Sequence, residues 1–277
     1  MTLDEFKAFL RSYNIWPKKG LGQNFLVDEN AMNQIISAAD LKKGDNIIEV
    51  GPGTGLLTEH LFAKAKKVVS VEYDPDMVKI LKRRFGSVGN LQVVHSDALK
   101  YRIADACFKD MGYKVVANIP YYITSPLIKH FLQSEQRPRL MVILVQKEVA
   151  EKICGITGKS LITIETQLFG KPEIVSIVPS GSFYPAPKVD SAVLKIEAYD
   201  KPLIPDKDMA DFLRIVKFGF SQKRKKLNNT LGAGLHIKSA EMAEILRKMD
   251  INPDLRPEDL EIADWAKLAK VLTKIEK

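Results

Sequence analysis

The chain has 277 residues, of which 45% are apolar, and carries a formal net charge of +8 at pH 7. This length and composition predict one larger domain with a sizeable core and a small second domain. The longest apolar run, Leu140 to Val145, is far shorter than the roughly 20 residues that a membrane-spanning helix needs, so we expect no membrane span. The positive charge is compatible with a nucleic-acid partner but does not require one.

The chain begins with a predicted helix rather than a targeting signal. Its TLDE segment predicts a capping box between Thr2 and Glu5, and the N-terminus lacks a basic-then-apolar signal pattern. The two cysteines, Cys107 and Cys154, lie far apart and lack the spacing of metal ligands. We therefore expect reduced cysteines, no metal site and a cytoplasmic protein.

Strand-like runs alternate with helical patterns from Asn46 onward. The runs read NIIEV, KVVSVEY, LQVVHSD, KVVAN and LMVILVQ. Strands that alternate with crossover helices predict a parallel sheet with helices on both faces, which is a doubly wound α/β fold. A last run, SAVLKIEAY from Ser191, predicts an antiparallel strand near the sheet edge.

A smaller helical domain is predicted after this sheet. The segment DKPLIPDKD is typical of a linker, and residues 207–277 show helical patterns throughout. We therefore expect one domain at residues 1–200 and a helical domain at residues 201–277. Between Asp211 and Lys238 there are seven Lys or Arg residues and one acid, including an unbroken basic run at 223–226. This run is interpreted either as an RNA-binding surface or as a solvated helix face.

A glycine-rich loop separates the first predicted strand from its helix. In EVGPGTG, Gly51, Gly53 and Gly55 let the backbone turn sharply and approach a ligand closely. The dinucleotide fingerprint of dehydrogenases has its third glycine at the position of Leu56, so a nicotinamide cofactor is disfavoured. The spacing suits a ligand with a ribose and an amino acid but no pyrophosphate, or a tight turn that binds nothing.

Two carboxylates follow the next two predicted strands. Glu72 ends VSVE, about 20 residues beyond the loop, where a carboxylate can accept both hydroxyls of a ribose. Asp97 ends VVHSD, where it can accept a hydrogen bond from an adenine amino group. Each acid alone is compatible with an ordinary polar residue at a strand end. Because the carboxyl ends of parallel strands form one crevice, the loop and both acids together predict an adenosine-type cofactor, and S-adenosylmethionine fits best.

The fourth strand end has the sequence VVANIPYYITSP. Pro120 cannot donate to a strand ladder, so the chain turns directly after Asn118, and Tyr121 follows the turn. The Asn118 amide oxygen and the carbonyl of Ile119 or Pro120 can accept the N–H bonds of an aromatic amine and so favour a tetrahedral, nucleophilic nitrogen. Tyr121 can stack on a base that has left its own stack. The alternative is a rigid turn with a core tyrosine.

Seven segments between about residues 18 and 200 read KKGLGQNFLVD, IIEVGPGTGLLT, VEYD, HSDAL, VVANIPYYITSP, LVQKEVAEKI and FYPAPKVDSAVLKI. In this order they resemble the ribosomal RNA adenine dimethyltransferase family, and specifically its small-subunit branch. The C-terminal segment FSQKRKKLNNTL departs from the family pattern, because many relatives have an aromatic residue and a proline near its start.

The resemblance implies a Rossmann-like S-adenosylmethionine-dependent methyltransferase domain followed by a small helical, rRNA-binding domain. It implies dimethylation of two adjacent adenosines in the hairpin loop near the 3′ end of small-subunit (16S) rRNA, with a role in subunit biogenesis. The implied partner is this rRNA or the immature small subunit, and we expect a monomer.

The resemblance also assigns residues to roles. The implied cofactor contacts are Asn24, Leu26, Gly51, Glu72, Asp97 and Asn118, with residues 23–26 closing over the cofactor. The implied catalytic residues are Asn118, Ile119, Pro120 and Tyr121, with Phe183 as a second stacking surface for the flipped adenine. The implied RNA contacts are Lys18, Lys19, Lys223, Arg224, Lys225 and Lys226.

Other functions stay open on the sequence alone. A large-subunit rRNA methyltransferase of the antibiotic-resistance type would use the same chemistry, although FYPAPKVDS and the long helical tail favour the small-subunit branch. A non-catalytic ribosome-assembly or transcription factor could use the same fold without the acceptors at Asn118, and the intact NIPY disfavours it. A dehydrogenase is the remaining option, which Leu56 disfavours.

Overall fold

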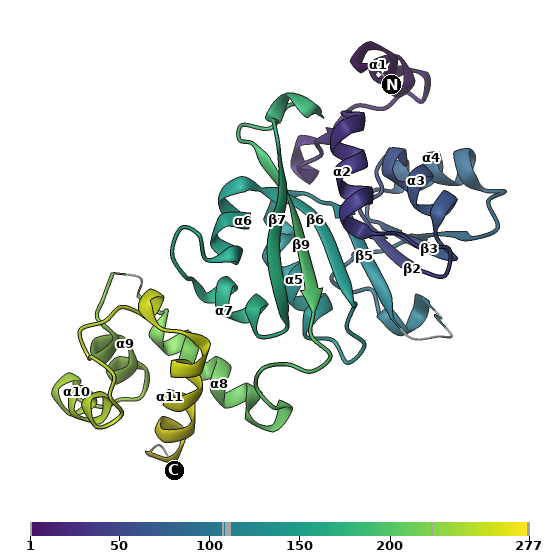
Figure 1. The fold of residues 1–277 in the computed structure, drawn as a ribbon. Helices are drawn as coiled ribbons and strands as arrows, with labels where there is room; N and C mark the ends of the chain where they lie inside the picture. The colour runs from purple at the N-terminus through teal and green to yellow at the C-terminus, as the bar shows by residue number, and fades with distance from the viewer. Residues whose placement is uncertain (1, 107, 109–111, 223, 276–277) are drawn as a thin grey trace. The chain divides into compact units, whose positions relative to one another are not determined.

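The computed structural model describes residues 2–106, 108, 112–222 and 224–275 (Figure 1). The chain forms two compact units, each with its own internal contacts. The first unit contains Met1–Ala150 and Lys171–Ala198, and the second contains Glu151–Gly170 and Tyr199–Lys277.

The first unit is built on a seven-stranded sheet with the strand order β4-β3-β2-β5-β6-β9-β7. Its strands are β2 (Asn46–Val50), β3 (Lys67–Glu72), β4 (Leu91–His95), β5 (Tyr113–Asn118), β6 (Leu140–Gln146), β7 (Gly170–Val178) and β9 (Ser191–Ala198). Strands β2 to β6 pair in parallel, whereas β9 pairs antiparallel with β6. The predicted parallel sheet and its antiparallel addition are both confirmed.

Strand β7, at the end of the sheet beside β9, is not predicted from the sequence. Pro172 indicates a break in a strand, and the side chains of β7 alternate between more buried and more exposed positions. An end strand tolerates proline, because one side of its backbone has no neighbouring strand to bond. Its partial exposure also removes the continuous apolar run that identifies the buried strands.

Helices connect the strands, cover the sheet or, at the N-terminus, pack beside another helix. They are α1 (Leu3–Ser12), α2 (Glu29–Ala39), α3 (Leu56–Lys64), α4 (Pro75–Phe85), α5 (Thr124–Leu132) and α6 (Lys147–Cys154), the last of which ends in the second unit. Short 3-10 turns lie at η1 (Lys19–Leu21), η2 (Ile103–Ala106), η3 (Tyr121–Ile123) and η4 (Ser180–Ser182), and β1 (Phe25–Leu26) pairs antiparallel with β8 (Phe183–Tyr184). The predicted capping box is present at the start of α1, where Thr2 and Glu5 bond each other's backbone N–H.

Apolar side chains cover both faces of the sheet. Successive strand residues point to opposite faces. Ile47 and Val68 belong to the buried cluster that includes residues of α2 and α3, whereas Ile48 and Val69, equally buried, point to the other face. Burial on both faces is typical of a doubly wound sheet, and it explains why these strands have no alternating polar pattern.

The second unit is helical. Its elements are α7 (Leu161–Gln167), α8 (Asp206–Gly219), α9 (Leu227–Gly234), α10 (Ser239–Lys248), η5 (Pro257–Asp259) and α11 (Ile262–Ile275). Phe212 and Trp265 are buried in its core. Gly219 lies against the Trp265 ring, where an added Cβ would come within 2.2 Å of a ring carbon, so α8 and α11 pack closely at this point.

Residues 151–170 group with the C-terminal helices, whereas the sequence places the division near residue 200 alone. The Leu203 N–H donates to the Leu168 carbonyl at 3.0 Å, and the Tyr199 N–H donates to the Phe169 carbonyl at 2.8 Å. Lys159 also forms an ion pair with Glu261. These bonds join residues far apart in the sequence, so local sequence patterns do not reveal them.

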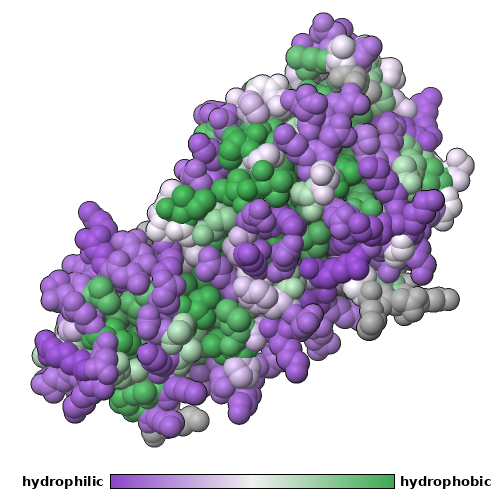
Figure 2. Space-filling model, in the orientation of Figure 1, coloured by the Kyte–Doolittle hydropathy of each residue, from purple (hydrophilic) through white to green (hydrophobic). Residues whose placement is uncertain are grey.

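No helix within the described residues is long and apolar enough to cross a membrane. Hydrophilic residues predominate on the face shown in Figure 2, with apolar patches between them. Single exposed apolar residues are normal for a folded protein. Two large aromatic side chains, Trp16 and Tyr122, are nevertheless mostly exposed.

Candidate active site

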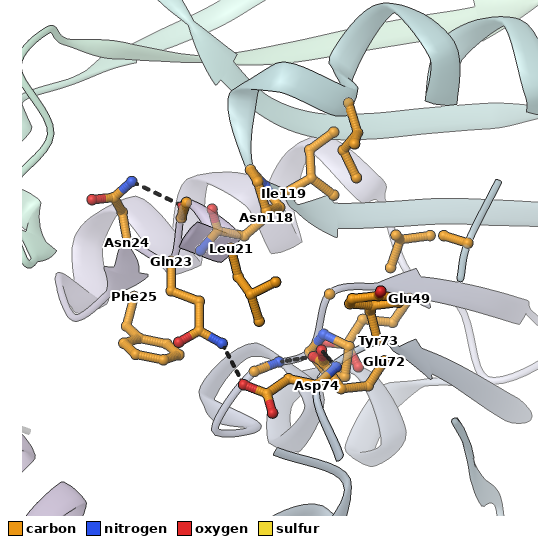
Figure 3. Close-up of a pocket in the computed structure, with 18 of the residues that line it drawn as sticks. Leu21, Gln23, Asn24, Phe25, Glu49, Glu72, Tyr73, Asp74, Asn118 and Ile119 are labelled. Atoms are coloured by element: carbon orange, nitrogen blue, oxygen red, sulfur yellow. Dashed lines mark hydrogen bonds between the residues drawn. The ribbon is translucent and has the colours of Figure 1, made fainter. Parts of the chain in front are cut away.

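A cavity of about 400 Å³ lies at the carboxyl ends of β2, β3, β4 and β5. Four strand-end segments line it, at residues 49–54, 71–74, 96–99 and 118–123, together with residues 21–26 and Phe183. Figure 3 shows ten of the lining residues with their labels. This volume is typical of a site for a small organic ligand. The cavity therefore lies where the sequence predicts that the strand ends meet.

The glycine loop between β2 and α3 forms one wall. Gly51, Gly53 and Gly55 all have positive φ angles. An added Cβ at Gly53 would lie 3.1 Å from the Phe25 ring, and one at Gly55 would lie 2.5 Å from the Phe85 ring. Both conformation and space therefore favour glycine at these two positions.

Glu72, at the end of β3, is buried and held by backbone donors. The Gly53 N–H donates to one carboxylate oxygen at 3.0 Å, and the Asp74 N–H donates to the other at 2.8 Å. Burial raises the pKa of Glu72, while these backbone hydrogen bonds act to lower it. The two bonds fix the orientation of the carboxylate toward the cavity.

Asp97 lies two residues after the end of β4 and is half-buried. Its Oδ1 accepts the Leu99 N–H at 2.9 Å, which fixes the side chain at the cavity wall. Tyr73, directly after Glu72, also lines the cavity and is 60% exposed.

Asn118 is the last residue of β5, and the chain turns at Pro120 into η3. The Pro120 carbonyl accepts the Ile123 N–H at 3.2 Å. The Tyr121 hydroxyl shares a hydrogen bond of 2.7 Å with the hydroxyl of Ser191, which is fully buried at the start of β9. Burial raises the pKa of Tyr121, against the effect of the Ser191 hydrogen bond. The sequence does not predict this anchor, because Ser191 is 70 residues away.

Residues 18–26, which we call the N-terminal strap, run along the cavity and are tied to the start of α4. Lys18 Nζ lies 2.7 Å from both Asp74 Oδ1 and Asp76 Oδ2, and Gln23 Nε2 donates to Asp74 Oδ2 at 2.8 Å. The hydrogen bonds to Asp74 and Asp76 raise the pKa of Lys18. Asp74 also caps α4 through the Asp76 N–H. The ammonium of Lys18 is therefore engaged within the protein, and a phosphate contact by Lys18 stays a prediction.

The end of the strap forms β1 and brings Phe183 to the cavity. Leu26 is paired with Phe183 in the two-stranded sheet, and both are buried and line the cavity. The Asn24 side chain donates to the Gly22 carbonyl at 3.2 Å within the strap. The structure thus brings Asn24, Leu26 and Phe183 to the same cavity as the strand-end residues.

Glu49 is a cavity residue that the sequence does not single out. Its carboxylate is buried and accepts hydrogen bonds from the Thr58 hydroxyl at 2.8 Å and the Ser70 hydroxyl at 2.6 Å. Burial raises its pKa to about 7, against the effect of these two bonds. An acid inside the apolar run NIIEV is the signal that could have identified it.

The predicted RNA-binding residues lie outside this cavity. Lys19 is exposed in η1. Arg224, Lys225 and Lys226 are exposed in the connection between α8 and α9, so the alternative of a solvated helix face does not describe them. Lys226 Nζ lies 2.8 Å from Asp254 Oδ1. Lys223, also predicted to bind RNA, lies outside the described residues.

Comparisons with known proteins identify the family. Residues 17–274 match the model of the ribosomal RNA adenine dimethylase family. The ribosomal RNA small subunit methyltransferase A of Dehalococcoides mccartyi is 40% identical over 97% of this chain and 92% of its own length. The protein of the same name from Clostridioides difficile is 37% identical, over 97% of this chain and 96% of its own.

Two solved structures support the same family. A dimethyladenosine transferase from Plasmodium falciparum has a TM-score of 0.77 and 29% identity, covering 90% of this chain and 98% of its own. The 23S rRNA methyltransferase ErmE has a TM-score of 0.71 and 26% identity, covering 90% of this chain and 100% of its own. The chain therefore belongs to the ribosomal RNA adenine dimethylase family.

Proposed function

We propose that the chain transfers methyl groups from S-adenosylmethionine to the exocyclic amino groups of two adjacent adenosines in the 3′-terminal hairpin loop of small-subunit rRNA. The observation that carries this proposal is the meeting of Glu72, Asp97 and Asn118–Tyr121 at one cavity, in a chain of the adenine dimethylase family. Its relatives are named as methyltransferases of the ribosomal RNA small subunit, and this supports the choice of substrate.

The polar groups of the cavity suit S-adenosylmethionine. The Glu72 carboxylate accepts the Gly53 and Asp74 N–H groups, and its remaining lone pairs are available to ribose hydroxyls. Asp97 uses Oδ1 for the Leu99 N–H, so we assign Oδ2 to the adenine amino group of the cofactor. At Gly51 an added Cβ would lie 3.2 Å from the Asn118 carbonyl, so glycine lets the loop lie close to the end of β5. When bound, the cofactor supplies an electrophilic methyl group on its sulfonium.

We assign binding of the target adenine to the turn after β5. The Pro120 carbonyl already accepts the Ile123 N–H, so the Ile119 carbonyl and the Asn118 amide oxygen are the better acceptors for the two N–H bonds of the substrate. Acceptors on both N–H bonds draw the nitrogen lone pair out of the ring and direct it at the methyl group. No strong base is needed, because the nitrogen loses its proton after it becomes cationic.

We assign two aromatic rings at the cavity to stacking on the extruded base. Tyr121 and Phe183 both line the cavity, from the turn after β5 and from β8. A base must leave its own stack before its amino group can be modified, and stacking on protein rings offsets part of that cost. The hydrogen bond to Ser191 fixes the Tyr121 ring before the substrate arrives.

We assign contacts with the RNA backbone to exposed basic side chains of both units. Lys19 and the segment Arg224, Lys225 and Lys226 carry positive charge at exposed positions. Phosphate contacts of this kind supply affinity without sequence specificity. We assign the immature small subunit as the partner and a monomer as the active form.

The test is methyl transfer from labelled S-adenosylmethionine to small subunits, large subunits and naked rRNA, followed by mapping of the label. We expect label on two adjacent adenosines of the small-subunit hairpin, and none with Asn118→Ala. Label only on large-subunit adenosine would contradict the proposal in favour of an activity like that of ErmE. RNA binding without transfer would favour a non-catalytic factor.

A further inference from the structure

A second hollow lies on the first unit, outside the proposed active site. It is an open groove of about 610 Å³ between the segment that follows α1 and the outer side of α4. Its lining includes Tyr13, Trp16, Pro17, Asp76, Lys79 and Arg83. We call it the Trp16 groove. None of the residues assigned above to the cofactor or the target base lines it.

Trp16 is 62% exposed, although tryptophan is among the largest apolar side chains. The segment that carries it is nevertheless well fixed. Ile15 donates its N–H to the Leu10 carbonyl at 3.0 Å, and Tyr13 packs against Phe9 in the apolar cluster between α1 and α4. Pro17 follows and restricts the backbone further. A fixed segment therefore presents an indole ring to solvent, and the core gains little from it.

The charge of the groove favours an anionic ligand. Lys79 and Arg83 are exposed along one side of α4, and the Arg83 guanidinium lies 5.3 Å from the centre of the Tyr13 ring. The acid in the groove, Asp76, lies 2.7 Å from Lys18 Nζ and 3.3 Å from Lys79 Nζ, so its charge is compensated. The four charged lining residues, Lys18, Asp76, Lys79 and Arg83, sum to +2. An aromatic platform beside cationic side chains is the common arrangement for single-stranded nucleic acid.

The groove adjoins the proposed active site through one cluster of charges. Asp74 lines the cavity and Asp76 lines the groove, and Lys18 pairs with both. The two hollows thus lie on either side of the start of α4. An RNA strand whose target base enters the cavity can reach the groove with a nearby nucleotide.

We propose that the Trp16 groove binds a nucleotide of the substrate RNA other than the target adenosine, with its base stacked on Trp16 and its phosphate between Lys79 and Arg83. This inference rests on the proposed function for the identity of the RNA. The groove contributes to RNA affinity and orientation, and it takes no part in methyl transfer itself.

Tryptophan fluorescence tests the contact directly, because the chain has only two tryptophans and Trp265 is fully buried in the second unit. Titration of the full chain with short oligoadenylate should quench the fluorescence of the wild type, since stacking on a base quenches indole emission. Trp16→Phe should remove the quenching and keep the affinity for RNA. Quenching that persists in Trp16→Phe would overturn the proposal.

Kinetics give a second test. Trp16→Ala should raise the KM for small subunits about tenfold or more, with kcat within about twofold of wild type and an unchanged melting temperature. Lys79→Gln and Arg83→Gln should each flatten the log–log salt dependence of oligoadenylate binding by about 0.7, whereas Lys82→Gln, an exposed neighbour outside the groove, should not. An unchanged KM in Trp16→Ala would overturn the proposal.

The outcomes separate this inference from the proposed function. Absence of methyl transfer by the wild type would contradict the proposed function, while the fluorescence titration would still report on the groove. Weakened binding of Trp16→Ala to assembled subunits, with unchanged binding to naked rRNA and oligoadenylate, would show a protein contact and overturn the RNA assignment.

Discussion

Replacement of the buried acid Glu49 by Gln should make the protein more stable at alkaline pH and leave it nearly unchanged at acid pH. Burial raises the pKa of Glu49 from 4.5 to about 7. The folded state therefore holds this proton more tightly than the unfolded chain. The stability that the proton contributes is complete below pH 4.5 and is lost as the pH rises through about 7.

The magnitude follows from the size of this shift. The difference between about 7 and 4.5 is about 2.5 pKa units, and each unit corresponds to 1.36 kcal/mol, so ionisation of Glu49 costs about 3 kcal/mol of folding free energy above pH 8. Gln resembles the protonated acid: its oxygen can accept the Ser70 hydroxyl at the place of Oε2, and its amide, at the place of Oε1, can donate to the Thr58 hydroxyl. Glu49→Gln should avoid most of the cost.

Denaturant unfolding of the ligand-free wild type and Glu49→Gln, at a series of pH values from 5 to 8.5, provides the assay. The other ionisable groups are present in both proteins, so the difference between the two free energies reports the titration of Glu49 together with its coupling to Glu72. We expect a difference of about 1 kcal/mol or less at pH 5 that grows to about 3 kcal/mol in favour of the variant at pH 8.5. A difference that does not change with pH would refute the reasoning.

Three further predictions concern the proposed site. Glu72→Ala should weaken S-adenosylmethionine binding by about tenfold or more, because it removes the acceptors for two ribose hydroxyls, and an unchanged calorimetric affinity would exclude Glu72 from the site. Tyr121→Ala should lower single-turnover methyl transfer about tenfold to a hundredfold, whereas Tyr121→Phe should retain most of it; a strongly destabilised Ala variant with normal transfer in its folded fraction would instead make Tyr121 a core residue. Replacement of residues 224–226 by Gln should spare cofactor binding and flatten the salt dependence of RNA binding by about 0.7–0.9 per lost phosphate contact, and parallel salt plots would contradict an RNA role for the segment.

Local patterns in the sequence are sufficient to predict much of the structure of this molecule. The parallel strands are evident because both of their faces are buried, and the lining of the cavity is evident because parallel strands end at the same side. The capping box of α1 depends on two residues three positions apart. In each case the physical cause lies within a short segment or in a general rule for sheets.

The features that the sequence does not predict depend on contacts between distant residues. Lys18 is 56 residues from Asp74, so its engagement at the start of α4 has no local signal. The hydrogen bond between Ser191 and Tyr121, which are 70 residues apart, likewise has no local signal. Strand β7 is missed for a different reason: Pro172 and partial exposure give it the pattern of a loop, and only its place at the sheet edge makes it a strand.

The position of β9 also has a consequence for synthesis of the chain on the ribosome. β9 lies between β6 and β7, although it follows both in the sequence. Until residues 191–198 emerge, the side of β6 that faces β9 has no strand to pair with, and β6 is almost entirely apolar. Unpaired apolar strand edges promote aggregation, so the nascent chain is most vulnerable in this interval. The arrival of Ser191 both closes that edge and fixes the Tyr121 ring, so the lining of the cavity is completed only when the sheet itself is complete.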